Sequence, residues 1–144
     1  MRLLLEVLFS FTGSLAFAIF FGAPRRCWAA GGCIGMVGWM ICRLLSLAGA
    51  GAGLATFVAA FAVMLLCRGA AVRLGCPVQV FLVPGTFSLI PGAALYWTAY
   101  HLVTRQLPQA LEGAVGSAEA VFAILLGIVF GMQLPAKAFA WLKK

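Results

Sequence analysis

Two Pro-Gly steps, Pro84-Gly85 and Pro91-Gly92, interrupt an apolar stretch that runs from Pro77 to Val103. Proline lacks the N–H of a helical hydrogen bond and an adjacent glycine lets the chain bend, so we expect each step to break a helix. In a bilayer, the freed backbone groups must be buried in protein or face a water-filled cavity. The stretch therefore predicts a broken helix that lines a polar passage.

The second step has the features of an anion site. A helix that restarts at Pro91 leaves its first N–H groups unpaired and points its positive dipole end into the membrane, which is how many transporters hold an anionic substrate group. A spacing of four places Tyr96 and Tyr100 on the face of Gly92. The alternative is a kinked structural helix with aromatic side chains at the membrane interface. The candidate substrate pathway comprises Pro84, Gly85, Thr86, Ser88, Pro91, Gly92, Tyr96 and Tyr100.

Three ionisable residues are candidates for ion coupling or charge pairing: Arg43, His101 and Glu119. Arg43 lies near the end of an apolar segment, where it either reaches the headgroups or takes part in a pathway. Glu119 is the only acidic residue of the last apolar segment, about one turn from its start, and is either functional or wetted at the interface. The five cysteines form no Cys-x-x-Cys pair, so we predict no metal site and no cofactor.

Composition excludes a soluble domain. Of the 144 residues, 65% are hydrophobic and 9% are charged, whereas soluble proteins carry roughly 25% charged residues. The net charge of +7 comes from basic residues that lie between apolar segments, so these residues indicate membrane topology rather than nucleic-acid binding. The sequence contains neither a nucleophile paired with a base nor a pair of carboxylates, so nothing in it indicates an enzyme.

The predicted fold class is an all-α integral membrane protein. Residues 1–144 form a single transmembrane domain, a bundle of about five helices with the fourth broken at the Pro-Gly steps. The first segment has a signal-peptide-like start, but its length and Glu6 favour a retained helix. Glycines four apart, Gly31 with Gly35 and Gly127 with Gly131, predict close helix packing. The expected spans are 3–21, 28–47, 51–67, 77–103 and 114–134.

The distribution of basic residues predicts an orientation. With five spans, one side holds Arg25, Arg26, Arg68, Arg73, Lys137, Lys143 and Lys144, and the other holds Arg2, Arg43 and Arg105. The positive-inside rule then places the C-terminus in the cytoplasm and the N-terminus outside. Such a start is natural for the second half of a larger transporter.

The run Val83 to Gly92, followed by Tyr96, resembles the signature of the threonine/serine exporter family in its short-subunit form. The sequence departs from the family pattern at Ser88, where a proline commonly stands. The resemblance implies a membrane subunit of an ion-coupled secondary exporter for threonine, serine or small carboxylates such as succinate. It also implies a larger partner subunit. We expect the chain in a bacterial-type inner membrane, where a homo-oligomer is a further possible assembly. The competing hypothesis is a scaffold or assembly subunit that does not itself transport.

Overall fold

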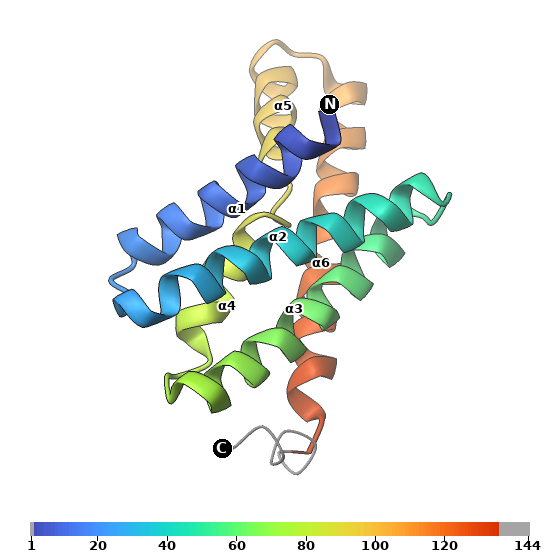
Figure 1. The fold of residues 1–144 in the computed structure, drawn as a ribbon. Helices are drawn as coiled ribbons and strands as arrows, with labels where there is room; N and C mark the ends of the chain where they lie inside the picture. The colour runs from blue at the N-terminus through green and yellow to red at the C-terminus, as the bar shows by residue number, and fades with distance from the viewer. Residues whose placement is uncertain (1, 136–144) are drawn as a thin grey trace.

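The computed structural model describes residues 2–135, which form six α-helices and no strand. Helices α1, α2 and α3 lie side by side and alternate in direction, and α6 crosses behind α3 (Figure 1). The predicted all-α membrane class is confirmed. The helices are α1 (Arg2–Phe20), α2 (Arg25–Leu47), α3 (Ala52–Leu74), α4 (Gln79–Phe87), α5 (Gly92–Val103) and α6 (Leu107–Gln133).

Three helices, α2, α3 and α6, are long and apolar enough to cross a membrane. The pair α4 and α5 qualifies as a fourth, broken span with a bend of 56°. The apolar part of α1, Leu4–Phe20, is shorter than these. The described residues thus contain three or four candidate spans by length and composition, and the fifth crossing stays a prediction.

The break in the fourth segment occurs at only one of the two Pro-Gly steps. Pro84 lies inside α4, so the predicted break at Pro84-Gly85 is wrong. Pro84 is fully buried and packs its Cγ 3.5 Å from the position of a Cβ on Gly31. This packing against α2 holds the helix together across the one missing hydrogen bond. The chain leaves helical geometry only at residues 88–91, before Pro91 and Gly92.

Basic residues that were expected to end spans lie inside helices instead. Arg25 and Arg26 form the first turn of α2, and α3 continues through Arg68 and Arg73 to Leu74. Arginine is a good helix former, so it marks the membrane boundary without ending the helix. The last helix likewise begins at Leu107 rather than near residue 114, which puts Glu119 more than three turns inside it and not one. Lys137, Lys143 and Lys144 lie outside the described residues.

Helix α3 is the centre of the packed core. Its side chains Val63 and Cys67 are fully buried, together with Phe81 of α4. Against its other face lies α6, where a Cβ on Gly127 would meet the carbonyl oxygen of Phe57 at 2.7 Å. Arg68 donates a hydrogen bond of 2.8 Å to the carbonyl of Gly131, which satisfies a free carbonyl in the last turn of α6. These contacts fix α6 to α3.

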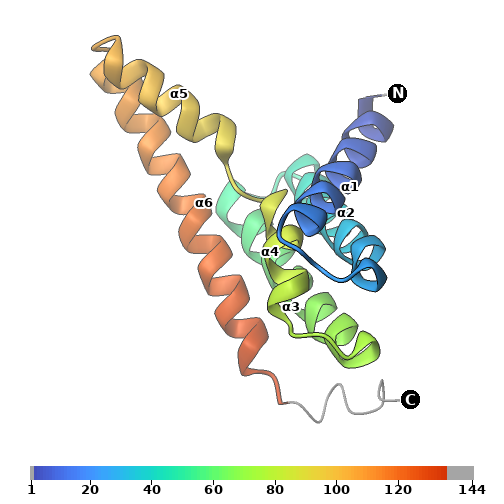
Figure 2. The ribbon, with the colours of Figure 1, turned by 90° about the vertical axis from the view of Figure 1, so that its left-hand side faces the viewer.

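Helix α5 is the exposed part of the fold. It packs along α6, and none of its residues is buried. Figure 2 shows α5 and the facing half of α6 as a hairpin that leans away from α1, α2 and α3. The broken segment therefore has one half, α4, within the core and the other half, α5, outside it.

Candidate functional site

A small pocket with two serines and a carboxylate among its lining residues lies where the broken helix meets α1 and α2. Its volume is about 280 Å³, and no lining residue comes from α5 or α6. We call it the break pocket, because Ser88, the first residue after α4, forms part of its wall. It is lined by Glu6, Phe9 and Ser10 of α1, Trp39 of α2, and Ser88.

One backbone carbonyl, on α2, accepts hydrogen bonds from α1 and from the residue that follows α4. The hydroxyl of Ser88 donates a hydrogen bond of 3.0 Å to the carbonyl oxygen of Gly35, and the hydroxyl of Ser10 donates one of 3.2 Å to the same oxygen. Gly35 permits this approach because it has no side chain: a Cβ there would lie 2.6 Å from Cβ of Ser14. Ser88 thus anchors the helix break to α2.

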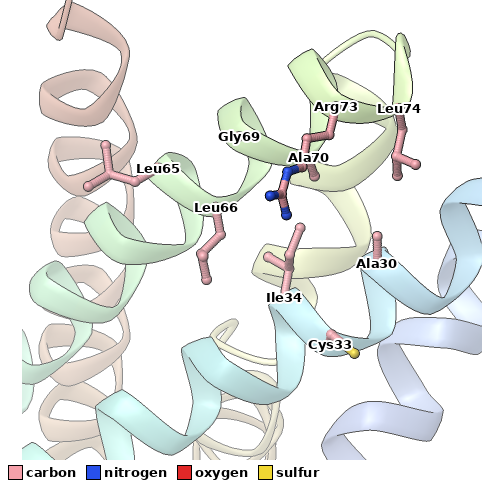
Figure 3. A pocket seen from close by; sticks show the side chains of 9 residues that line it. All are labelled: Ala30, Cys33, Ile34, Leu65, Leu66, Gly69, Ala70, Arg73 and Leu74. Atoms are coloured by element: carbon pink, nitrogen blue, oxygen red, sulfur yellow. The ribbon is translucent and has the colours of Figure 1, made fainter. Parts of the chain in front are cut away.

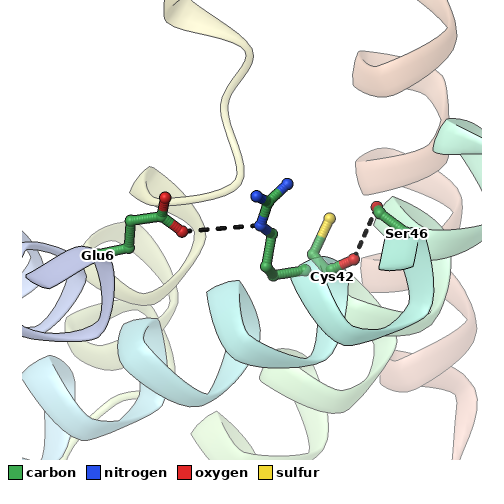
Figure 4. Close-up of polar contacts among 4 residues, drawn as sticks. Glu6, Cys42 and Ser46 are labelled. Atoms are coloured by element: carbon green, nitrogen blue, oxygen red, sulfur yellow. Dashed lines mark hydrogen bonds and ion pairs between the residues drawn. The ribbon is translucent and has the colours of Figure 1, made fainter. Parts of the chain in front are cut away.

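Glu6, one of the pocket's lining residues, forms an ion pair with Arg43. Nε of Arg43 lies 3.6 Å from Oε2 of Glu6, with the two side chains 46% and 37% exposed. Figure 4 shows the Glu6 carboxylate reaching from α1 toward this cation on α2. The separation exceeds a hydrogen bond, and Oε2 of Glu6 is buried without a hydrogen-bond partner among the described residues. A buried carboxylate oxygen in this state can accept a donor from a ligand.

The predicted site on α5 is separate from this pocket. The side chains of Tyr96 and Tyr100 are 64% and 46% exposed, and Trp97 lies between them with its ring centroid 5.5 Å from each. The N–H of Gly92 donates to the carbonyl of Ile90 at 2.8 Å. No heavy atom lies within 4 Å of the position of a Cβ on Gly92. Within this chain, the α5 face is open and aromatic.

Thr86 and Gly85 of the predicted pathway make contacts within α4 and between α4 and α2. The hydroxyl of Thr86 donates to the carbonyl of Leu82, one turn earlier in α4, at 2.8 Å. Gly85 is buried, and a Cβ there would meet Ile34 of α2 at 2.9 Å. Of the eight predicted pathway residues, Ser88 is the one that lines the break pocket.

The three ionisable candidates each have different neighbours in the fold. Arg43 borders the break pocket through Glu6, as described. His101 contacts Gln106 at the α5–α6 turn, with 3.0 Å between Nδ1 and Oε1. Glu119 is exposed on α6 and packs its carboxylate against Gly53 at the start of α3. The structure thus brings one of the three to the pocket.

Sequence reasoning missed Glu6, Ser10 and Trp39 as site residues. A helical spacing was available to find them, because Glu6 and Ser10 are four residues apart, as are Trp39 and Arg43. Each pair therefore presents a polar or amphipathic face on its helix. What the spacing does not reveal is that these two faces meet.

A family model described as Threonine/Serine exporter, ThrE matches residues 6–134. The chain belongs to the threonine/serine exporter family. The match covers every residue of the break pocket and both Pro-Gly steps. No curated protein and no solved structure matches the chain. Membership in the threonine/serine exporter family supports an export role for a multi-pass membrane protein.

Proposed function

We propose that this chain is a subunit of a secondary exporter and that its break pocket binds the amino-acid substrate. The observation that carries the proposal is the Glu6–Arg43 pair beside two serine hydroxyls at a helix break. A free amino acid carries one carboxylate and one ammonium group on neighbouring atoms. A site of two opposite charges is complementary to that arrangement.

Each charged group has capacity left for a ligand. The Arg43–Glu6 contact uses Nε, so the two terminal nitrogens of Arg43 are available to bind a carboxylate in the planar fork geometry that guanidinium provides. Oε2 of Glu6 lacks a hydrogen-bond partner and can accept from an ammonium group. Substrate entry would then replace the long ion pair by two shorter charge-assisted hydrogen bonds.

The hydroxyls supply the specificity that the family name suggests. Ser10 and Ser88 both donate their hydrogens to Gly35, so their oxygen lone pairs remain free to accept a hydrogen bond from a substrate hydroxyl. Threonine and serine each carry such a hydroxyl. A site built to bond a hydroxyl discriminates strongly against analogues without one.

Charge favours an amino acid over a dicarboxylate. A second substrate carboxylate would lie near Glu6, and like charges at close range repel. The volume of about 280 Å³ suits a small metabolite, since it lies below the range of roughly 300–1,000 Å³ for drug-sized molecules. We therefore expect threonine or serine rather than succinate.

The assembly we propose is a complex with a larger subunit of the same family in a bacterial-type inner membrane, with the C-terminus cytoplasmic. Its support is the α5 face, where Tyr96, Trp97 and Tyr100 are all about half exposed or more. Aromatic residues of this kind are enriched at protein interfaces. The anion site predicted at Pro91, Gly92 and Tyr96 would then be formed jointly with residues of the partner subunit. Replacing Trp97 by alanine should weaken co-purification of the partner while leaving this chain folded.

The experiment is reconstitution of the complex purified from native membranes through a tag on this chain. Liposomes containing both subunits should export labelled threonine, with competition from serine and weak competition from succinate. Either subunit alone should fail to transport. Full-rate transport by the partner alone would instead establish the scaffold role.

A further inference from the structure

A second cavity lies on the opposite side of α2 from the break pocket's α1 wall, between α2 and α3. It has a volume of about 640 Å³, which falls within the range of roughly 300–1,000 Å³ for sites that bind organic molecules. Apart from Arg73, its walls are apolar side chains such as Ile34 and Leu66, a small thiol and a glycine. We call it the α2/α3 groove. The export function proposed above does not use it.

The groove opens at the outer surface of the described helices. Cys33 of α2 is exposed, and Leu66 of α3 is 40% exposed, so both walls end at the outer surface. Both helices are long and apolar enough to span the membrane. A ligand would enter sideways from lipid, and the apolar walls fit a hydrocarbon chain.

The charge at one end identifies the class of ligand. Arg73 lies in the last turn of α3, and Figure 3 shows its guanidinium pointing into the space between the helices, above Ile34. Among the described residues, no acidic side chain forms an ion pair with Arg73. Guanidinium presents its donors in a fork that matches phosphate. The groove thus combines an apolar trough with one phosphate-binding group.

The charged end also lies where headgroups would be. The start of α2 and the end of α3 meet there, since Sγ of Cys27 lies 2.9 Å from Sγ of Cys76 just beyond Arg73. Arg25 and Arg26 in the first turn of α2 do not line the groove, but as basic residues at a helix end they indicate that this end lies at a membrane face. Basic pockets between transmembrane helices at one membrane face are known to bind anionic lipid headgroups.

We propose that the α2/α3 groove binds one anionic phospholipid, with an acyl chain along the groove and the phosphate on Arg73. The occupant is a lipid rather than a protein helix because Arg73, the single cation among the residues that line the groove, complements a phosphate, while the other lining residues offer a partner helix no charged contact. The lipid would fill the space between α2 and α3 and hold the two helices at their present separation.

The test is native mass spectrometry of the purified, delipidated full chain titrated with dioleoyl phosphatidylglycerol or dioleoyl phosphatidylcholine. One phosphatidylglycerol should bind about tenfold more tightly than phosphatidylcholine, because the choline cation of phosphatidylcholine offsets its phosphate charge and repels Arg73, and weakening one charge-assisted contact has about this effect on affinity. Arg73→Gln should bring the two affinities close together. Cys33→Phe should weaken both lipids by filling the groove, while Cys33→Ala should weaken neither.

Arg25→Gln is the matched control, because Arg25 lies at the same end of the bundle but stacks over Trp28, 5.9 Å from its ring centroid, and does not line the groove. Its preference for phosphatidylglycerol should match the parent chain. If Arg73→Gln fails to fold by circular dichroism, Arg73→Lys takes its place and should show an intermediate preference. Equal affinities for the two lipids in the parent chain would overturn the proposal. An unchanged preference in the Arg73 variant would also overturn it. So would a dimer of this chain in the same mass spectra that persists when lipid is added, because a second copy would then occupy the groove.

Discussion

Nε of Arg43 lies 3.6 Å from Oε2 of Glu6, and this contact joins α1 to α2 at the edge of the break pocket. The two residues are 46% and 37% exposed, and partly exposed ion pairs contribute little to stability, about 0–1 kcal/mol. A carboxylate within an apolar membrane helix is energetically unfavourable, and so weak an ion pair does not offset that cost. Ligand binding explains the presence of Glu6 better than stability does.

The first prediction follows from this difference between a small effect on stability and a large effect on ligand binding. Glu6→Gln and Arg43→Gln should each change the free energy of unfolding by less than about 1 kcal/mol, yet each should lower the affinity for threonine about tenfold to a hundredfold. Thermal unfolding and transport by the reconstituted complex measure the two effects. Glu112→Gln, on the exposed part of α6, is the control and should leave both unchanged. Loss of folding in parallel with loss of transport would instead assign the pair a structural role.

Ser88 separates the anchoring role from the substrate role. Ser88→Ala removes the 3.0 Å hydrogen bond to Gly35, which should cost about 0.5–1.5 kcal/mol of stability. It also removes an acceptor from the pocket, so threonine transport should fall more than transport of alanine. Thr86→Val, whose hydroxyl bonds only within α4, should preserve the ratio of the two substrates. An equal loss for both substrates in Ser88→Ala would limit this residue to anchoring.

Gly35 tests the contact between α1 and α2. A Cβ at this position would lie 2.6 Å from Cβ of Ser14 and would also collide with its hydroxyl, so Gly35→Ala should destabilise the chain, by about 1–3 kcal/mol for an overpacked core. Gly13→Ala is the matched control, since nothing lies within 4 Å of a Cβ there. That change should be neutral or slightly stabilising. Equal unfolding temperatures for the two variants would contradict the packing described.

Gly127 tests the contact between α3 and α6. A Cβ on Gly127 would meet backbone atoms, the carbonyl of Phe57 at 2.7 Å and the N–H nitrogen of Phe61 at 2.9 Å. Backbone cannot move as a side chain does, so Gly127→Leu should prevent α6 from docking and greatly reduce the amount of folded protein. Gly116→Leu, in the same helix with no atom within 4 Å, should be tolerated. Fluorescence-detected size-exclusion chromatography compares the two, and comparable peaks would show that the face meets lipid only.

The all-α membrane class followed from the sequence because long apolar runs and their basic flanks are local properties. The two Pro-Gly steps show where local reasoning fails. Both have the same residues, yet Pro84 is buried against α2 and stays helical, while Pro91 is partly exposed and sits at the break. The difference comes from tertiary packing, since only one step has a neighbouring helix to hold it.

The site was only partly accessible to sequence analysis for a similar reason. Ser88 and Arg43 were among the candidates because of their chemistry and position. Glu6 served in the sequence analysis only to favour a retained first helix, because its partner is 37 residues away in the chain and nothing local indicates that α1 packs on α2 at this register. The exposed aromatic face of α5 shows the limit again, because its role depends on what covers it.

The central claim is that Glu6 recognises the substrate ammonium group, and one binding comparison tests it directly. The purified complex is titrated with threonine and with 2,3-dihydroxybutyrate, which has a hydroxyl in place of the amino group, in the parent chain and in Glu6→Gln. The parent should bind threonine at least about tenfold more tightly than the analogue, since a charge-assisted hydrogen bond is lost, and the variant should bind the two almost equally. The same preference for threonine in both proteins would contradict the account.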